Sequence, residues 1–238
     1  MFVDIYCLLY GDHARLHLRL LKSLVRYLPS GEAHVVIWAN VVCHRTAKWL
    51  HDHAPEDWDL VFSEENVPKY TAMRKMLHET HKPTTPWIVW FDDDSHVVQP
   101  DWWSKTRKYI EEKESESIVY FGERWYVHHL PGQPEFIKKA SWYAGRAWEL
   151  CPTRKKGVRK PGITFATGAY WWLRTDVMKR LDWPDMRLRH NGGDTLLGEA
   201  VRQSGLPFHN FHYGVKVNDA LRRGYHEKPA GASVNVRR

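Results

Sequence analysis

Cysteine is scarce in this chain, and its scarcity excludes a disulfide scaffold. The 238 residues include three cysteines, Cys7, Cys43 and Cys151, which lie far apart and form no paired metal-ligand motif. Small secreted domains are typically rich in disulfides, whereas cytosolic proteins keep their thiols reduced. We therefore expect a protein of a reducing compartment.

Long hydrophobic runs are also lacking. The amino terminus "MFVDIYCLLYG" has no basic residue ahead of its apolar run and carries Asp4 inside it, which favours a first strand over a signal peptide. No apolar stretch approaches the ~20 residues that a membrane-spanning helix needs. We expect a soluble, cytoplasmic protein without a membrane partner, and the sequence indicates no oligomeric state.

The composition is that of a globular protein with a large core. Hydrophobic residues make up 43% and charged residues 26% of the chain, and the 13 tryptophans must be mostly buried because indole rings are costly to expose. The net charge of +7 favours a polyanionic partner or substrate without requiring one. Internal repeats and low-complexity segments are absent, so we expect one domain.

Strand and helix patterns alternate through the first half. Short, nearly continuous apolar runs predict strands at 2–10, 34–39, 59–62, 87–91 and 118–121. Helical spacing predicts helices at 13–28, 44–54, 67–80 and 101–113. Strands without polar alternation are covered on both faces, so the prediction is an α/β fold with a mainly parallel, doubly wound central sheet and flanking helices. Ligands of such sheets gather beyond the carboxyl ends of the strands.

The second half is less regular. Prolines and glycines between residues 122 and 162 predict loops with one short helix near 139–149. Beyond this segment the sequence predicts a strand at 168–173, a short helix begun by Thr175 or Asp176, a helix at 194–204 and a strand at 207–213.

The stretch "WIVWFDDDSHVV" at 87–98 brings three aspartates to the end of a buried strand. In extended backbone Asp92 and Asp94 face one side and Asp93 the other. Two unit charges 4 Å apart repel by about 4 kcal/mol at an effective dielectric constant of 20, so a co-facing pair needs a compensating cation or proton. Mg²⁺ or Mn²⁺ is a natural choice, since both bind carboxylate oxygens. The alternative is that the aspartates cap the helix near Asp101 or lie solvated in a loop.

Three segments together resemble one family. The segment "KYTAMRKMLHETHKPTTPWIVWFDDDSHV", then "TGAYWWLRTDVMKRL", then "NGGDTLLGEAVRQSGLPFHNFHYG" resemble, in order and spacing, segments of GT-A fold glycosyltransferases. The likeness is to the fringe and β1,3-galactosyltransferase group and, more loosely, to family 2-type transferases. It spans residues 69–214 and implies a single GT-A domain over 1–238. Its parts are a nucleotide-sugar half (1–98), an acceptor and catalytic half (99–215) and a C-terminal tail (216–238).

The resemblance implies a metal site. Asp94 is the expected main ligand of Mn²⁺ or Mg²⁺, and Asp92 is expected to contact the metal through water or to hold the donor's sugar or ribose. Asp93 is the aspartate with the least defined donor role. His212 would complete the metal site, although with 15 histidines in the chain a core or surface position is a serious alternative.

His226 competes with His212 for the metal, because "GYHEKPAG" resembles the carboxyl-terminal donor motif of glycogenin-like transferases. In that arrangement Lys228 would lie over the diphosphate of the donor.

The resemblance also implies an inverting mechanism with Asp194 as general base. Gly168 and Gly193 would leave room for the acceptor beside it. The alternative for Asp194 is a helix N-cap, and a helix amino terminus would lower the pKa of its carboxyl and weaken it as a base.

Four residues are expected to contact the nucleotide. Tyr10 ends the first strand, where this fold usually holds the base, and Arg15 follows on the next helix. Arg74 and Lys75 precede the metal strand, and Lys75 matches the family's lysine. A solvated helix face is the alternative for the three cations.

The acceptor is open. The basic run "RKKGVRKPG" with Arg154, Lys155 and Lys156, together with aromatics such as Trp171, suits a phosphate backbone with stacked or extruded bases. One hypothesis is a phage-encoded hexosyl- or pentosyltransferase, acting in the host cytoplasm, that moves a sugar from a UDP-sugar to a hydroxylated or hydroxymethylated DNA base. A carbohydrate, lipid or small-molecule acceptor is equally compatible. A metal-dependent nuclease and a basic nucleic-acid-binding module are the alternatives outside this class.

Overall fold

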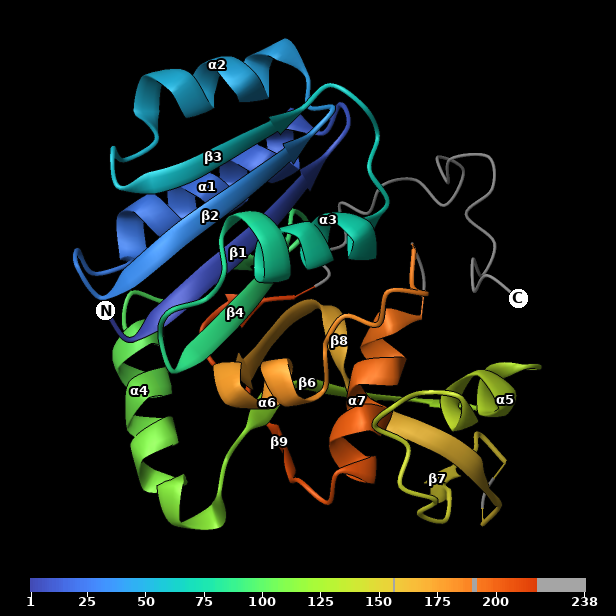
Figure 1. Ribbon diagram of the computed structural model, residues 1–238. Helices are drawn as coiled ribbons and strands as arrows, with labels where there is room; N and C mark the ends of the chain where they lie inside the picture. The colour runs from blue at the N-terminus through green and yellow to red at the C-terminus, as the bar shows by residue number, and fades with distance from the viewer. Residues whose placement is uncertain (156, 190–191, 218–238) are drawn as a thin grey trace.

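A mixed β-sheet forms the centre of the molecule (Figure 1). The computed structural model describes residues 1–155, 157–189 and 192–217. The strand order is β3-β2-β1-β4-β8-β6-β9, with β7 paired to β8. The parallel half consists of β1 (Val3–Tyr10), β2 (Ala33–Asn40), β3 (Trp58–Ser63) and β4 (Trp87–Asp92). All four predicted strands of this half are therefore confirmed.

The other half of the sheet contains a long antiparallel strand. It consists of β6 (Tyr120–His128), β7 (Glu149–Pro152), β8 (Arg159–Arg174) and β9 (Phe208–Asn210). Strand β8 runs antiparallel to β4, β6 and β7, while β9 is parallel to β6. The prediction of loops between 122 and 162 is confirmed for 129–132, 139–148, 153–155 and 157–158, but it missed the outer part of β6, β7 and the start of β8. Pro152 lies within β7, and Pro161 and Gly162 lie within β8, so these residues do not break the strands.

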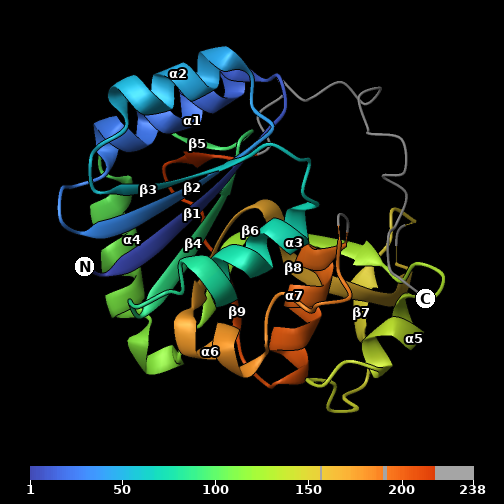
Figure 2. The ribbon, with the colours of Figure 1, turned by 45° about the horizontal axis from the view of Figure 1, so that its top comes forward.

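Helices cover both faces of the sheet (Figure 2). One face packs against α1 (Ala14–Tyr27), α2 (His44–His53) and α4 (Trp102–Glu112). The opposite face packs against α3 (Lys69–Lys75), the π-helical turn η1 (Met76–Thr80), α5 (Gln133–Lys138), α6 (Thr175–Arg180) and α7 (Gly193–Gln203). Along β1, Val3, Ile5, Cys7 and Leu9 enter the first core while Tyr6 and Leu8 enter the second, which confirms the two-sided burial and the α/β fold.

Two helix predictions changed in detail. The predicted helix at 67–80 begins at Lys69, after Pro68, and its last turn is π-helical. The short helix predicted near 139–149 is instead α5, before that segment, and residues 140–148 form an irregular loop against α7. A small 3-10 turn, η2 (Glu114–Glu116), follows α4.

The strand order creates a crevice at the carboxyl ends of β1 and β4. From β1 the chain moves outward through β2 and β3, then returns to place β4 on the other side of β1. Such a reversal is where doubly wound sheets bind ligands. A two-stranded ribbon of β5 (His96–Val97) and β10 (Val215–Lys216) packs beside it. Among the described residues, no helix is long and apolar enough to cross a membrane.

Candidate active site

Strand β4 ends at Asp92, and the next residues form a turn rather than extended backbone. The backbone N–H of Ser95 donates to the Asp92 carbonyl oxygen at 3.1 Å, which closes this turn. The strict alternation predicted through Asp94 therefore stops one residue into the triplet. Asp93 still turns inward and is fully buried, while Asp92 and Asp94 stay partly exposed.

Asp93 joins the carboxyl ends of β1 and β4 to helix α1. Its Oδ2 accepts the backbone N–H of Tyr10 at 3.1 Å and lies 3.1 Å from His17 Nε2, with both side chains fully buried. The other ring nitrogen of His17 lies 2.9 Å from Thr46 Oγ1 on α2. Buried charges persist only when they are paired and hydrogen-bonded. Asp93 therefore has a structural role, because its hydrogen bonds connect the turn after β4 to the end of β1 and to helix α1.

Asp92 is compensated by a lysine. Lys69 Nζ, at the start of α3, donates to Asp92 Oδ2 at 2.5 Å and to the Gly168 carbonyl oxygen at 2.9 Å. Trp90 Nε1 donates to the other carboxylate oxygen, Oδ1, at 2.8 Å. The charges of Asp92 and Asp93 are thus compensated by different partners.

Asp94 lies partly exposed in the turn after β4, where it could meet a metal ion. The described residues contain no group of three or more His, Cys, Asp and Glu side chains placed to hold a metal. Hard cations such as Mg²⁺ keep several waters and are often held by one or two carboxylates plus substrate phosphates, so this donor set fits an ion bound mainly by a diphosphate.

His212 lies just before the ribbon strand β10. Its carbonyl oxygen accepts the N–H of Val215 at 3.3 Å, and Val215 pairs with Val97 of β5. This pairing brings the 212–216 segment beside the residues that follow the aspartate turn. The second histidine candidate, His226, and Lys228 lie outside the described residues.

Asp194 lies in the first turn of α7, whose N-cap residue is Gly192, so the N-cap alternative for Asp194 was wrong. Its backbone N–H donates to Tyr70 Oη at 3.0 Å. Burial raises the pKa of the Asp194 carboxyl, while Lys69 and hydrogen bonds from the backbone of Thr195 and Gly168 oppose the rise. The expected lowering of this pKa by the helix terminus is therefore outweighed by burial.

Gly168 is brought to Asp194 by an irregularity in β8. The pairing with β6 passes from Ala166 opposite Arg124 to Trp171 opposite Gly122, so four residues of β8 face one of β6. A Cβ atom added to Gly168 would lie 3.2 Å from Asp194 Cβ and 3.3 Å from Oδ2. A larger residue would therefore press on the carboxylate.

Two other acceptor candidates have structural roles. A Cβ atom on Gly193 would collide with the ring of Tyr70, so the space beside this glycine is filled by protein. Trp171 is 2% exposed and stacks on Trp90, with ring centroids 6.1 Å apart and planes 10° apart. Its indole belongs to the core, as do those of Trp102, Trp103 and Trp172.

Of the four residues predicted to contact the nucleotide, Tyr10 lies at the crevice, and the three cations have other surroundings. Tyr10 ends β1 at the crevice, and its hydroxyl accepts a hydrogen bond from Asn66 at 3.4 Å. Arg15 and Lys75 are exposed on α1 and α3. Arg74 donates to Pro184 O at 2.7 Å and pairs with Asp182 at 3.0 Å, so it secures the segment after α6.

Lys69 is the site residue that sequence reasoning missed. The resemblance directed attention to Lys75, six positions later on the same helical segment. The available signal was the triplet Pro68-Lys69-Tyr70, because a proline before a helix start places the next residues at its amino end, which here faces the strand ends. Tyr70, also missed, contributes the hydroxyl that holds Asp194.

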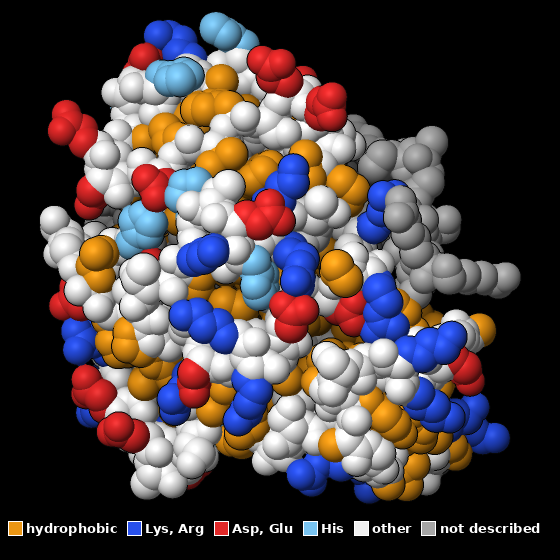
Figure 3. Space-filling view, in the orientation of Figure 1, with side chains coloured by type: hydrophobic (Ala, Val, Ile, Leu, Met, Phe, Trp, Pro, Cys, Tyr) orange, Lys and Arg blue, Asp and Glu red, His pale blue; other side chains and the backbone are white. Residues whose placement is uncertain are grey.

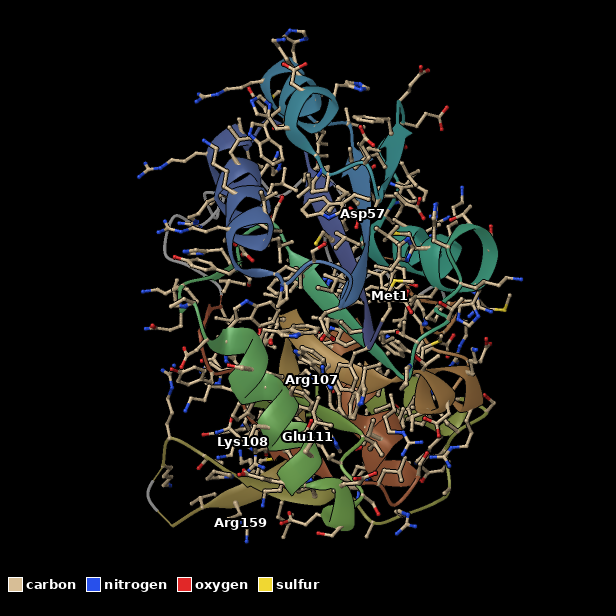
Figure 4. The ribbon with its side chains drawn as sticks, turned by 90° about the vertical axis from the view of Figure 1, so that its left-hand side faces the viewer. Met1, Asp57, Arg107, Lys108, Glu111 and Arg159 are labelled. Atoms are coloured by element: carbon tan, nitrogen blue, oxygen red, sulfur yellow. The ribbon has the colours of Figure 1, made fainter. Side chains whose placement is uncertain are left out.

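Positive charge gathers away from the crevice, on α5 and the β7–β8 hairpin at the lower right of Figure 3. Residues 124–160 include nine Lys or Arg and two Asp or Glu, a net charge of +7 that equals that of the whole chain. Arg154 and Lys155 are exposed in the hairpin turn, while Lys156 lies outside the described residues. Arg159, labelled in Figure 4, is exposed at the start of β8.

Comparisons with known proteins agree with the topology. The family model described as "Glycosyl transferase family 2" matches residues 14–182. A search of curated protein sequences finds no match.

Two solved structures that resemble the chain are longer than it and distant from it in sequence. A mannosyltransferase from Pyrobaculum calidifontis, in complex with GDP-Man and Mn²⁺, superposes with a TM-score of 0.62 at 16% identity, over 94% of this chain and 58% of that one. A structure of S. aureus TarS gives 0.56 at 13% identity, over 89% of this chain and 58% of that one. The likeness at this level of identity is one of fold, and the chain spans 58% of either structure's length.

Proposed function

We propose, because this chain belongs to glycosyl transferase family 2, that it transfers a sugar from a nucleotide-sugar to an acceptor hydroxyl. The observation that carries the proposal is the meeting of Asp92, Lys69, Gly168 and Asp194 at the crevice between β1 and β4. Residues from β4, α3, β8 and α7 converge there, at the position where a doubly wound sheet binds its ligand.

For the donor we propose a nucleotide-sugar lying over the ends of β1 and β4, with Tyr10 near the base. The Pyrobaculum calidifontis structure holds GDP-Man and Mn²⁺ on a similar fold, which supports a nucleotide-sugar and a divalent ion here. A UDP-sugar is our first choice, and the transferred group is a hexose or pentose. When bound, Mn²⁺ or Mg²⁺ would neutralise the diphosphate leaving group. Asp94 is the residue we propose to hold the ion, with His212 or His226 as the second protein ligand.

For the chemical step we propose inversion with Asp194 as general base. One carboxylate must accept the proton of the acceptor hydroxyl as that oxygen attacks the anomeric carbon. Burial raises the pKa of Asp194, which makes its ionised form a stronger base than an exposed aspartate. Tyr70 fixes the backbone of Asp194, and Gly168 leaves its carboxylate uncovered on one side.

For the acceptor we propose a hydroxylated or hydroxymethylated base in DNA, as in the modification of phage genomes. The support is electrostatic: the excess positive charge of the chain lies on residues 124–160, and exposed Trp125 and Tyr126 on β6 lie within this segment. Phosphate contacts by Lys and Arg and stacking on aromatic rings are the usual means of binding exposed bases. A carbohydrate or lipid acceptor is the competing proposal.

A thermal-shift screen tests the donor. The protein is heated with each nucleoside diphosphate and nucleotide-sugar, with and without Mn²⁺, and a ligand that binds the folded state raises the melting temperature. We expect one nucleotide class to stabilise the protein only with metal. Indifference to every nucleotide would refute the transferase proposal.

A transfer assay then tests the acceptor. The stabilising nucleotide-sugar, Mn²⁺ and hydroxymethylpyrimidine DNA are incubated with the protein. The DNA is then digested to nucleosides, and mass spectrometry shows whether a sugar has been added to the modified base. Unmodified DNA is the control. If the donor binds but hydroxymethylated DNA gains no sugar, the DNA acceptor is ruled out while the donor site stands.

A further inference from the structure

Lys69 occupies the centre of the site and is held from several directions. It is 16% exposed, donates to Asp92 and to the Gly168 carbonyl, and lies over the rings of Tyr70 and Trp90, 5.6 Å and 5.8 Å from their centroids. Cation–π contacts and two hydrogen bonds to oxygen leave this ammonium little freedom. Its place is therefore a property of the fold.

Both oxygens of Asp92 already accept hydrogen bonds from the protein. Oδ2 accepts from Lys69 at 2.5 Å and Oδ1 from Trp90 at 2.8 Å, and Trp90 is fully buried and stacked on Trp171. A divalent ion on either oxygen would stand beside the Lys69 ammonium, and two cations at such short range repel each other strongly. Each carboxylate oxygen has a second lone pair, so Asp92 can still accept a hydrogen bond from a neutral hydroxyl.

We infer that Lys69 is the resident counter-cation of Asp92 and Asp194, and that it reserves Asp92 for a hydroxyl of the donor and keeps it out of the metal's coordination. This inference rests on the proposed function and narrows it. Lys69 acts as a positioning residue: it fixes the Asp92 carboxylate and places a positive charge close to the base.

The environment of Asp194 supports this assignment. Lys69 is the strongest influence that opposes the burial-driven rise of the Asp194 pKa, and Asp92 acts in the opposite direction. One ammonium thus compensates two carboxylates contributed by β4 and α7. Gly168 connects them, because its carbonyl binds Lys69 and its Cα side faces Asp194.

Measurements of Mn²⁺ affinity distinguish the role of Asp92 from that of Asp94. In the full chain, Mn²⁺ affinity is measured by the electron paramagnetic resonance of the free ion, with the nucleoside diphosphate that stabilises the protein. We expect Asp94→Asn to weaken Mn²⁺ binding about tenfold or more, because even residues that only support metal ligands change metal affinity by about 10–100-fold when they are replaced. Asp92→Asn should leave Mn²⁺ affinity unchanged while raising the KM for the nucleotide-sugar.

Two substitutions of Lys69 test whether its positive charge keeps the metal ion away from Asp92. Lys69→Met keeps a straight side chain of similar length without the ammonium, and Lys69→Arg keeps the charge. We expect Lys69→Met to tighten Mn²⁺ binding several-fold, because Asp92 becomes available, and the double variant with Asp92→Asn to abolish this gain. Lys69→Arg should retain native Mn²⁺ affinity. Circular dichroism and the melting temperature of each variant confirm folding.

The outcomes are distinguishable. If Asp92→Asn weakens Mn²⁺ binding as much as Asp94→Asn, Asp92 is a metal ligand and the inference is overturned. If Lys69→Met does not tighten Mn²⁺ binding, Lys69 does not keep the ion away from Asp92, and the inference is overturned as well. If the native protein binds no Mn²⁺ with any nucleotide, the proposed metal-dependent transfer itself fails.

Discussion

At the scale of single residues, Asp194 shows how burial sets the chemistry of a carboxylate. Burial raises its pKa, against the opposing charge of Lys69. If Asp194 is the base, it must be ionised to accept a proton, so kcat/KM should fall as the pH drops through this raised pKa. The acidic limb should therefore lie above ~3.9, the ordinary pKa of aspartate, in a pH profile of initial rates.

The contribution of Asp194 to folding stability should depend on pH in the direction opposite to that of kcat/KM. Because the folded-state pKa of Asp194 is raised above its unfolded value, the ionised carboxylate destabilises the fold at high pH, and this cost disappears as the pH falls below the unfolded pKa. We expect Asp194→Asn to abolish transfer and to raise the melting temperature at pH 8, with little effect at pH 4. The exposed Asp176→Asn is the matched control. A lower melting temperature of Asp194→Asn at pH 8 would contradict this account.

At the scale of elements, helix α7 organises the segment that sequence reasoning read as a helix. Gln203 is fully buried. Its Oε1 accepts the backbone N–H groups of Ala144 at 3.2 Å and Arg146 at 3.0 Å, and its Nε2 donates to Arg146 O at 3.1 Å. The side chain of Gln203 therefore holds the backbone of Ala144 and Arg146, in the middle of the irregular segment 140–148.

Removal of this side chain should release the loop. We expect Gln203→Ala to cost about 0.5–1.5 kcal/mol of stability for each hydrogen bond lost, because Ala144 and Arg146 are exposed and water can bind their freed N–H groups. The same change should accelerate amide hydrogen exchange at 140–148. Exchange is followed by mass spectrometry, with the exposed Gln99→Ala as control. Unchanged protection of this segment in Gln203→Ala would show that other contacts hold it.

The accuracy of the sequence predictions differs between the halves for a physical reason. The parallel strands were predictable because residues such as Ile5, Val36 and Val89 are covered on both faces, which requires continuous apolar runs. For strand β6, by contrast, the sequence predicted only the start, at 118–121, and missed the outer end, which carries exposed Arg124, Trp125 and Tyr126. Pairing with β8, which is distant in sequence, makes it a strand, and local composition carries no sign of that partner.

At the scale of the whole molecule, the excess positive charge lies on residues 124–160, away from the candidate active site between β1 and β4 (Figure 3). The +7 of residues 124–160 equals the charge of the entire chain, whereas helix α4, with Arg107, Lys108 and Glu111 in Figure 4, carries acids and bases together. A polyanionic acceptor should therefore bind the α5 and hairpin side. Its affinity should fall steeply with salt, because phosphate contacts release counterions.

Charge reversal tests this surface. We expect the double change Lys138→Glu and Lys139→Glu to weaken DNA binding and to reduce the salt slope by about 0.7–0.9 per lost phosphate contact, without affecting nucleotide binding. The control is Lys105→Glu with Lys108→Glu on α4, which makes the same change in net charge. Fluorescence anisotropy over a salt series gives both slopes. Equal losses in the two double variants would show that only net charge matters.

The sequence by itself determined the covered parallel sheet, the place where "WIVWFDDDSHVV" emerges from it, and the family resemblance, because burial and strand ends leave local patterns. Only the tertiary structure decided what each aspartate does. Lys69 compensates Asp92, His17 and the Tyr10 backbone hold Asp93, and Tyr70 fixes Asp194. These partners lie between 23 and 124 positions away along the chain, so their charges and hydroxyls act on the aspartates only once the sheet has folded.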